Sequence, residues 1–266
     1  VEVAGAEADG DSTLRVDPDG TGTGDTLTVK LDHATAGSSI DIAGLTVNSF
    51  ETVTIESSNV STAAATVTNV IDDIAGTSSD TTLNISGSSN FTATGIENTW
   101  TKVNVTNTAT TNLTVDSGGA LTYVGGAGAD RLELDTVADL ATGDSLTGGD
   151  GEDTLAFSAI PSALSAVQLG LISGFETLEF EATNTLTGNV ALGISTEAGM
   201  DTVKLTGALT TDSAKQLTIT ANSGLTLDMG AHTATGGDND DLIISIVGAA
   251  NAGTNDVVNL KVQNIA

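Results

Sequence analysis

Three short segments of the chain combine glycine and aspartate in the same order. They are Gly125-Gly-Ala-Gly-Ala-Asp130-Arg-Leu132, Gly148-Gly-Asp-Gly-Glu-Asp153-Thr-Leu155 and Gly236-Gly-Asp-Asn-Asp-Asp241-Leu-Ile243. The first two fit the pattern G-G-x-G-x-D-x-apolar at every specified position, and in the third Asn239 replaces the glycine of the fourth position. Glycine permits a tight turn with inward carbonyl oxygens, and the aspartate adds a carboxylate before a strand. Two such turns stacked together would offer about six oxygen ligands, a set that suits Ca²⁺ better than Mg²⁺.

At these residues the chain resembles the RTX family, the calcium-binding nonapeptide-repeat proteins that Gram-negative bacteria secrete. The resemblance implies calcium binding by aspartate side chains and turn carbonyls of stacked repeats. The residues that this implies as ligands are Asp130, Asp153 and Asp241, with carbonyls near Gly126, Gly128, Gly149, Gly151 and Gly237. Family repeats recur every nine residues, whereas Asp130 and Asp153 are 23 apart. Asp144 lies in a degenerate copy nine residues before Asp153, which predicts an insertion near 135–141 and a further candidate ligand.

An acidic residue followed by a β-type segment recurs along the whole chain, and this wider pattern is similar to RTX-type surface-layer (S-layer) proteins. Examples are Asp153-Thr-Leu, Glu176-Thr-Leu and Asp201-Thr-Val, and the phrase Ile172-Ser-Gly-Phe-Glu-Thr-Leu. That resemblance implies a secreted cell-surface subunit that assembles into a lattice or filament in the presence of calcium. It also implies export by a type I system, and a polysaccharide on the cell surface is a possible anchor. The chain opens without a signal peptide, so we expect a fragment, or export that uses no such signal.

The charge balance independently favours a fold that depends on cations. Asp and Glu total 35 against 7 Lys and Arg, so the formal net charge is −28. Stacked acidic turns repel one another, and each bound Ca²⁺ would cancel two charges and add its binding energy to folding. Seven scattered cations cannot form a nucleic-acid-binding patch. The chain has no Cys, which excludes thiolate metal sites, and its two His nearly exclude a metal centre built from histidines. No segment is apolar over the length that a transmembrane helix needs.

Short apolar bursts with period-two alternation predict an all-β fold. Typical bursts are Leu27-Thr-Val-Lys-Leu31, Val53-Thr-Ile55, Leu83-Asn-Ile85, Val103-Asn-Val105 and Leu217-Thr-Ile219. One strand signal per twenty-odd residues indicates an elongated parallel β-solenoid or β-roll, in which each turn buries its apolar side on its neighbours. We expect a segment 1–122 without full calcium motifs and an RTX-like segment 123–266. A helix is expected over 161–171, with Leu164, Val167 and Leu171 on one face, and a strand over the ambiguous segment 61–74.

Two other functions stay open at the level of sequence. A secreted polysaccharide-modifying enzyme could use paired carboxylates, but the chain has few cations to hold a polyanion and no hydrolase triad, so we expect no catalytic residues. An RTX adhesin that binds a surface or ice is the second alternative, because Thr-x-Thr pairs such as Thr52-Val-Thr54 put both hydroxyls on one strand face. Regular registration of these pairs on one face would favour the adhesin, and scattered placement would favour the lattice protein.

Overall fold

The computed structural model describes most of the chain and divides it into two compact units. The described residues are 2–3, 12–17, 22, 24–33, 37–58, 67–77, 81–116, 118–161, 163–181, 184–186, 189–194, 199–207, 209–212, 216–221, 224–229, 232–235, 241–246 and 259–262. Unit 1 comprises Val1–Glu133 and Gly143–Asp153, and unit 2 comprises Leu134–Thr142 and Thr154–Ala266. The predicted division at residue 123 rests on where the glycine turns begin. The bounds of the two compact units do not test it, so it stays a prediction.

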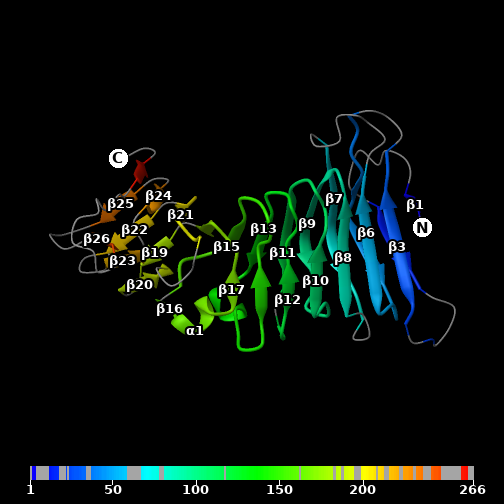
Figure 1. The fold of residues 1–266 in the computed structure, drawn as a ribbon, viewed down its shortest axis with the longest axis horizontal. Coiled ribbons are helices and arrows are strands. Elements are labelled where there is room, and N and C mark those ends of the chain that lie inside the picture. The colour runs from blue at the N-terminus through cyan, green and yellow to red at the C-terminus, as the bar shows by residue number, and fades with distance from the viewer. Residues whose placement is uncertain are drawn as a thin grey trace. The chain divides into compact units, whose positions relative to one another are not determined.

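Unit 1 is a parallel β-solenoid with two sheets, and successive strands alternate between them. Sheet A contains, in spatial order, β1 (Glu2–Val3), β3 (Thr26–Leu31), β6 (Thr52–Ser57), β8 (Thr82–Gly87), β10 (Lys102–Val105), β12 (Thr122–Val124) and β14 (Ser145–Thr147). Sheet B contains β2 (Thr13–Val16), β5 (Gly44–Val47), β7 (Thr68–Ala75), β9 (Asn90–Ile96), β11 (Thr111–Val115) and β13 (Arg131–Leu134), with the short β4 (Asp41–Ile42) also paired to β7. One strand of each sheet makes one rung of the solenoid, and Figure 1 shows β3, β6, β8 and β10 side by side.

The alternating bursts form the core of unit 1, as the sequence predicts. In sheet A the registered inward positions begin with Leu27, Val53 and Leu83, and Val103 and Tyr123 continue the column. Each of these side chains is buried. Parallel strands in register bring equivalent side chains of successive rungs together, so each rung covers the apolar side of the previous one.

Unit 2 is also a parallel β-solenoid, but its rungs contain three strands. The first sheet contains β15 (Thr154–Phe157), β18 (Thr177–Phe180), β21 (Thr202–Leu205), β24 (Thr226–Met229) and β27 (Asn259–Val262). The second contains β16 (Ala163–Leu164), β20 (Val190–Gly193), β23 (Gln216–Ala221) and β26 (Asp241–Ile246), and the third β19 (Asn184–Leu186), β22 (Leu209–Asp212) and β25 (His232–Thr235). Outside these sheets unit 2 has β17 (Ile172–Ser173), α1 (Ala166–Leu169) and a 3₁₀ turn at Val137–Asp139. The predicted insertion near 135–141 therefore coincides with this 3₁₀ turn.

The recurring acid-Thr-apolar phrase has a simple meaning in unit 2. Thr154, Thr177 and Thr202 are paired in register on the outer side of the first sheet, and Leu155 and Leu178 are paired on its inner side. Two positions further, the Phe157 and Phe180 rings stack with centroids 6.1 Å apart. Each position of the repeated phrase therefore corresponds to one column of side chains in the solenoid.

The helix expected over 161–171 is wrong in extent and in its buried face. The structure has β16 at Ala163–Leu164 and then one helical turn at Ala166–Leu169. Ser165 caps this turn, because its side chain accepts a hydrogen bond from the Gln168 N–H while the Gln168 side chain accepts one from the Ser165 N–H. Val167, predicted to share one face with Leu164 and Leu171, is 68% exposed, whereas Leu164 and Leu169 are buried.

The predicted strand over 61–74 is confirmed for its second half, because β7 begins at Thr68, and residues 59–66 lie outside the described part. In the part of the chain that the structure describes, no helix has the length and apolar character needed to cross a bilayer.

The turn before β6 holds a residue in a backbone conformation that favours glycine. Ser49 has φ 61°, and Gly174 occupies the same place before Phe175 with φ 64°. The phenylalanine that follows each of them is buried as a core anchor. Because a side chain in this region is strained, we expect Ser49→Gly to raise the free energy of unfolding by about 0.5–1 kcal/mol. Gly174→Ser should lower it by a similar amount in thermal melts, and a Ser49→Gly variant less stable than wild type would contradict this account.

Candidate metal centre

The two full glycine turns lie directly on one another in adjacent rungs of unit 1. A Cβ atom on Gly149 would lie 2.4 Å from the Gly126 carbonyl oxygen, and one on Gly151 would lie 2.3 Å from that of Gly128. The Asp150 N–H also donates to the Gly126 carbonyl over 2.9 Å. Gly149 and Gly151 have φ 114° and 135°, which other residues rarely adopt. The glycines are therefore required both by the turn and by the close stacking, and the 23-residue separation of the two aspartates spans one rung.

Asp130 lies inside this stack and is almost fully buried, with 1% of its surface exposed. Its Oδ1 accepts a hydrogen bond from the Thr111 N–H over 3.0 Å, and its Oδ2 accepts one from the Gly126 N–H over 2.7 Å. Burial raises the pKa of Asp130, and these hydrogen bonds oppose that rise. No ion pair to Asp130 occurs among the described residues, and its neighbour Arg131 pairs with Glu133. A buried carboxylate without a cation at hand is a suitable ligand for one.

Asp153 continues the arrangement one rung later. It is fully buried, and its Oδ1 accepts a hydrogen bond from the Asp130 N–H over 2.7 Å. Asp144 makes the same contact in sheet A, where its Oδ1 accepts from the Leu121 N–H over 2.7 Å, and Glu51 accepts from the Asp25 N–H over 2.6 Å. The acidic residue before a strand thus binds the backbone of the previous rung.

Sequence analysis missed this role of the acids. The signal was present, because the acid recurs immediately before a strand, but spacing does not reveal which N–H of the previous rung lies opposite. Charge-assisted hydrogen bonds to backbone N–H groups stabilise the stacking of rungs even without a metal.

The structure brings some of the predicted ligands together and separates others. Asp130, Asp153 and Gly126, Gly128, Gly149 and Gly151 share one stack of turns. Asp144 precedes β14 of sheet A, whereas Asp130 precedes β13 of sheet B. Asp241 begins β26 of unit 2, and Gly237 lies outside the described residues. Within the described ranges, no three His, Asp or Glu side chains gather in a metal-binding group.

The residues of the stack nevertheless fit a hard cation by their chemistry. Each carboxylate oxygen has two lone pairs, so an Asp130 oxygen that accepts one N–H can still contact a cation. Carboxylate and carbonyl oxygens are the ligands that Ca²⁺ prefers. When bound, the ion would supply a positive charge next to the buried Asp130 and Asp153 carboxylates.

Tyr123, the single tyrosine of the chain, lies beside this stack. It is fully buried on the inner side of β12. Burial raises its pKa well above the usual value, and the negative charges of Asp130 and Asp153 add to the rise. Since these charges act on the phenol, Tyr123 is a natural spectroscopic reporter of an ion in the stack.

The outer face of sheet A carries two registered columns of small polar side chains. One column is Thr26, Thr52, Thr82, Lys102, Thr122 and Ser145, and the other is Thr28, Thr54, Asn84, Asn104, Val124 and Thr147. Asn104 Nδ2 donates to Asn84 Oδ1 over 2.9 Å, which links neighbouring rungs of the second column. Thr-x-Thr pairs are therefore in register in the rungs of β3 and β6, and Lys102 and Val124 interrupt the columns further along.

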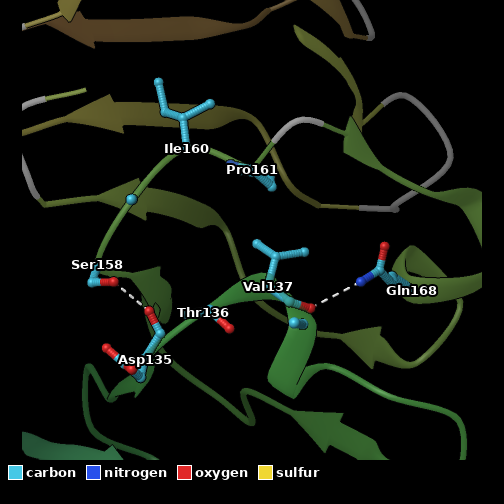
Figure 2. A pocket seen from close by; sticks show the side chains of 9 residues that line it. Asp135, Thr136, Val137, Ser158, Ile160, Pro161 and Gln168 are labelled. Atoms are coloured by element: carbon cyan, nitrogen blue, oxygen red, sulfur yellow. Dashed lines mark hydrogen bonds between the residues drawn. The ribbon is translucent and has the colours of Figure 1, made fainter. Parts of the chain in front are cut away.

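Unit 2 has an open hollow of about 440 Å³ between the 3₁₀ turn and the segment after β15. Figure 2 shows Asp135, Thr136 and Val137 on one side and Ile160 and Pro161 on the other. Gln168 closes one end, where its Nε2 donates to the Val137 carbonyl over 2.9 Å. Asp135 is the one carboxylate among its described lining residues, whereas acid–base chemistry on sugars commonly uses two.

Searches against protein-family models, curated proteins and solved structures found no match for this chain. The resemblance to RTX proteins accordingly rests on the motif residues themselves.

Proposed function

We propose that this chain is a non-catalytic structural subunit of a bacterial surface layer, which folds and self-assembles when it binds extracellular Ca²⁺. The observation that carries the proposal is the stack of two glycine turns with Asp130 and Asp153 buried in it. A solenoid of repeated rungs is suited to a structural role, because each rung mainly supports its neighbours.

The net charge gives calcium a reason to control folding. At −28 the chain repels itself, and extracellular calcium modules bind with Kd values of about 10⁻⁴–10⁻³ M. Such sites would be empty in a low-calcium cytosol and filled outside the cell. This agrees with the secretion and the type I export that the RTX resemblance implies, and a cell-surface polysaccharide would be a suitable anchor for the layer.

The registered columns on sheet A favour a second candidate, a segment of an RTX adhesin that binds a surface or ice. A face of in-register hydroxyl and amide groups can match a periodic partner. Electron microscopy of the purified protein with and without calcium separates the two functions. Ordered sheets or filaments that form with calcium support the surface layer, whereas monomers that bind ice or a polysaccharide support the adhesin.

The calcium site itself is testable by substitution at Asp153. We expect Asp153→Asn to weaken calcium binding at least about tenfold, because it removes a charged oxygen from the stack. Terbium luminescence excited through Tyr123, with calcium as competitor, reports the occupancy of this stack. Asp116→Asn is the matched control, because Asp116 is exposed in unit 1 outside the glycine turns. Equal calcium affinities of the two variants would refute the assignment.

A further inference from the structure

Two buried oxygen atoms near the glycine stack have no hydrogen-bond partner among the described residues. They are Asn107 Oδ1 and Ser89 Oγ, and both residues are fully buried. Buried polar atoms in folded proteins are nearly always bonded to protein, water or an ion. These two oxygens therefore indicate that something further belongs beside them.

The same solenoid contains a second buried asparagine whose side-chain oxygen and nitrogen are both bonded. Asn69 Oδ1 accepts from the Ile40 N–H over 2.9 Å, and its Nδ2 donates to Ser57 Oγ over 3.0 Å. Asn69 is also fully buried in unit 1. An unbonded amide oxygen is thus a particular feature of Asn107, since the fold satisfies a buried asparagine elsewhere.

Asn107 lies one rung before the first glycine turn and contacts it. A Cβ atom on Gly126 would lie 2.6 Å from the backbone carbonyl oxygen of Asn107 and 3.3 Å from Asp130 Oδ2. Asn107 Nδ2 donates to the Ser89 carbonyl over 2.9 Å and to Thr111 Oγ1 over 3.3 Å. The Thr111 N–H in turn donates to Asp130 Oδ1. Ser89, Asn107 and Asp130 therefore belong to one buried polar cluster across three rungs.

We propose that Asn107 and Ser89 supply amide and hydroxyl oxygens to a divalent cation that also contacts Asp130. This site lies one rung before the motif turns, and it rests on the proposed calcium-dependent function. Two neutral oxygens belong to the same buried cluster as the Asp130 carboxylate, which has no ion pair among the described residues. Together they form a hard, oxygen-only ligand set, which suits Ca²⁺. The glycine–aspartate pattern does not mark the site, because Thr106-Asn-Thr-Ala-Thr-Thr111 contains neither glycine nor aspartate.

The decisive variant is Ser89→Ala, because it removes an unbonded hydroxyl and leaves the Ser89 carbonyl that accepts from Asn107. Without calcium, we expect its melting temperature to equal or exceed that of wild type, since no hydrogen bond is lost. With calcium, the concentration for half-maximal thermal stabilisation should rise at least about tenfold. Asn107→Leu should raise it as well, and it should also melt lower without calcium because the Nδ2 contacts are lost.

Asn69→Leu is the matched control, and we expect it to lower the melting temperature without moving the calcium midpoint. If calcium does not stabilise the wild-type protein, the proposed function itself fails. If wild type responds to calcium and Ser89→Ala has the wild-type midpoint, the inference is overturned and an ordered water fills the site. A shifted midpoint for Ser89→Ala, with an unshifted one for Asn69→Leu, supports the cation. Because Ser89→Ala is a small change, it decides the question even where Asn107→Leu does not fold.

Discussion

Removing calcium is expected to lower the melting temperature of the protein by about 5–10 °C for every site that is emptied. At a hundredfold excess of calcium over its Kd, one site contributes about 2.7 kcal/mol to the stability of the folded state. For a chain of this length, each kcal/mol shifts the melting temperature by about 2–4 °C. Without the ion, the buried aspartates also repel one another in the folded state. Unfolding moves these charges apart, so their repulsion lowers the melting temperature further.

The measurement is a thermal melt followed by β-type circular dichroism, in calcium and after chelation. Magnesium at the same concentration is the control, because it screens the charge of −28 but fits an all-protein oxygen cage poorly. If magnesium stabilises the protein as well as calcium does, general screening explains the effect. If chelation leaves the melting temperature unchanged, calcium does not stabilise the fold of this protein.

The strands were predictable because alternation is a local property of the sequence. Leu27-Thr-Val-Lys-Leu31 and Leu217-Thr-Ile219 lie in β3 and β23 with their apolar residues buried. The number of sheets was not predictable from alternation. Two-strand rungs in unit 1 and three-strand rungs in unit 2 depend on how each connection turns, and a half-buried strand has the same pattern in either.

The helix and the acids show where local patterns are insufficient. Pro161 suggested a helix start, but the capping pair Ser165 and Gln168 lies later, so the helix begins at Ala166 and comprises one turn. Glycine–aspartate spacing predicted turns at Asp130 and Asp153, but it did not show which turns stack on each other. It did not show that these carboxylates bind N–H groups of the previous rung, because that contact joins residues about twenty positions apart.

The largest effect of a single substitution is expected at Gly125. A Cβ atom there would lie 1.5 Å from the Gly148 carbonyl oxygen, a backbone atom of the next rung. Gly125 N–H also donates to the Thr147 carbonyl over 2.8 Å, so the two rungs cannot separate without breaking this bond. We expect Gly125→Ala to lower the free energy of unfolding by about 3 kcal/mol or more, because overpacking against backbone is relieved only by moving a whole rung.

Gly119→Ala is the matched control, because a Cβ atom at Gly119 would meet no atom within 4 Å and its φ is not positive. That variant should be unchanged or more stable by about 0.4–1 kcal/mol, since alanine restricts the unfolded chain. Urea denaturation of both variants, with calcium and with a chelator, measures the difference. The deficit of Gly125→Ala should persist without calcium, because it arises from the stacking of backbone on backbone and not from the ion. If the two variants were equally stable, the rungs at residues 125 and 148 would not be in contact, and the stacked turns on which the calcium site depends would be wrong.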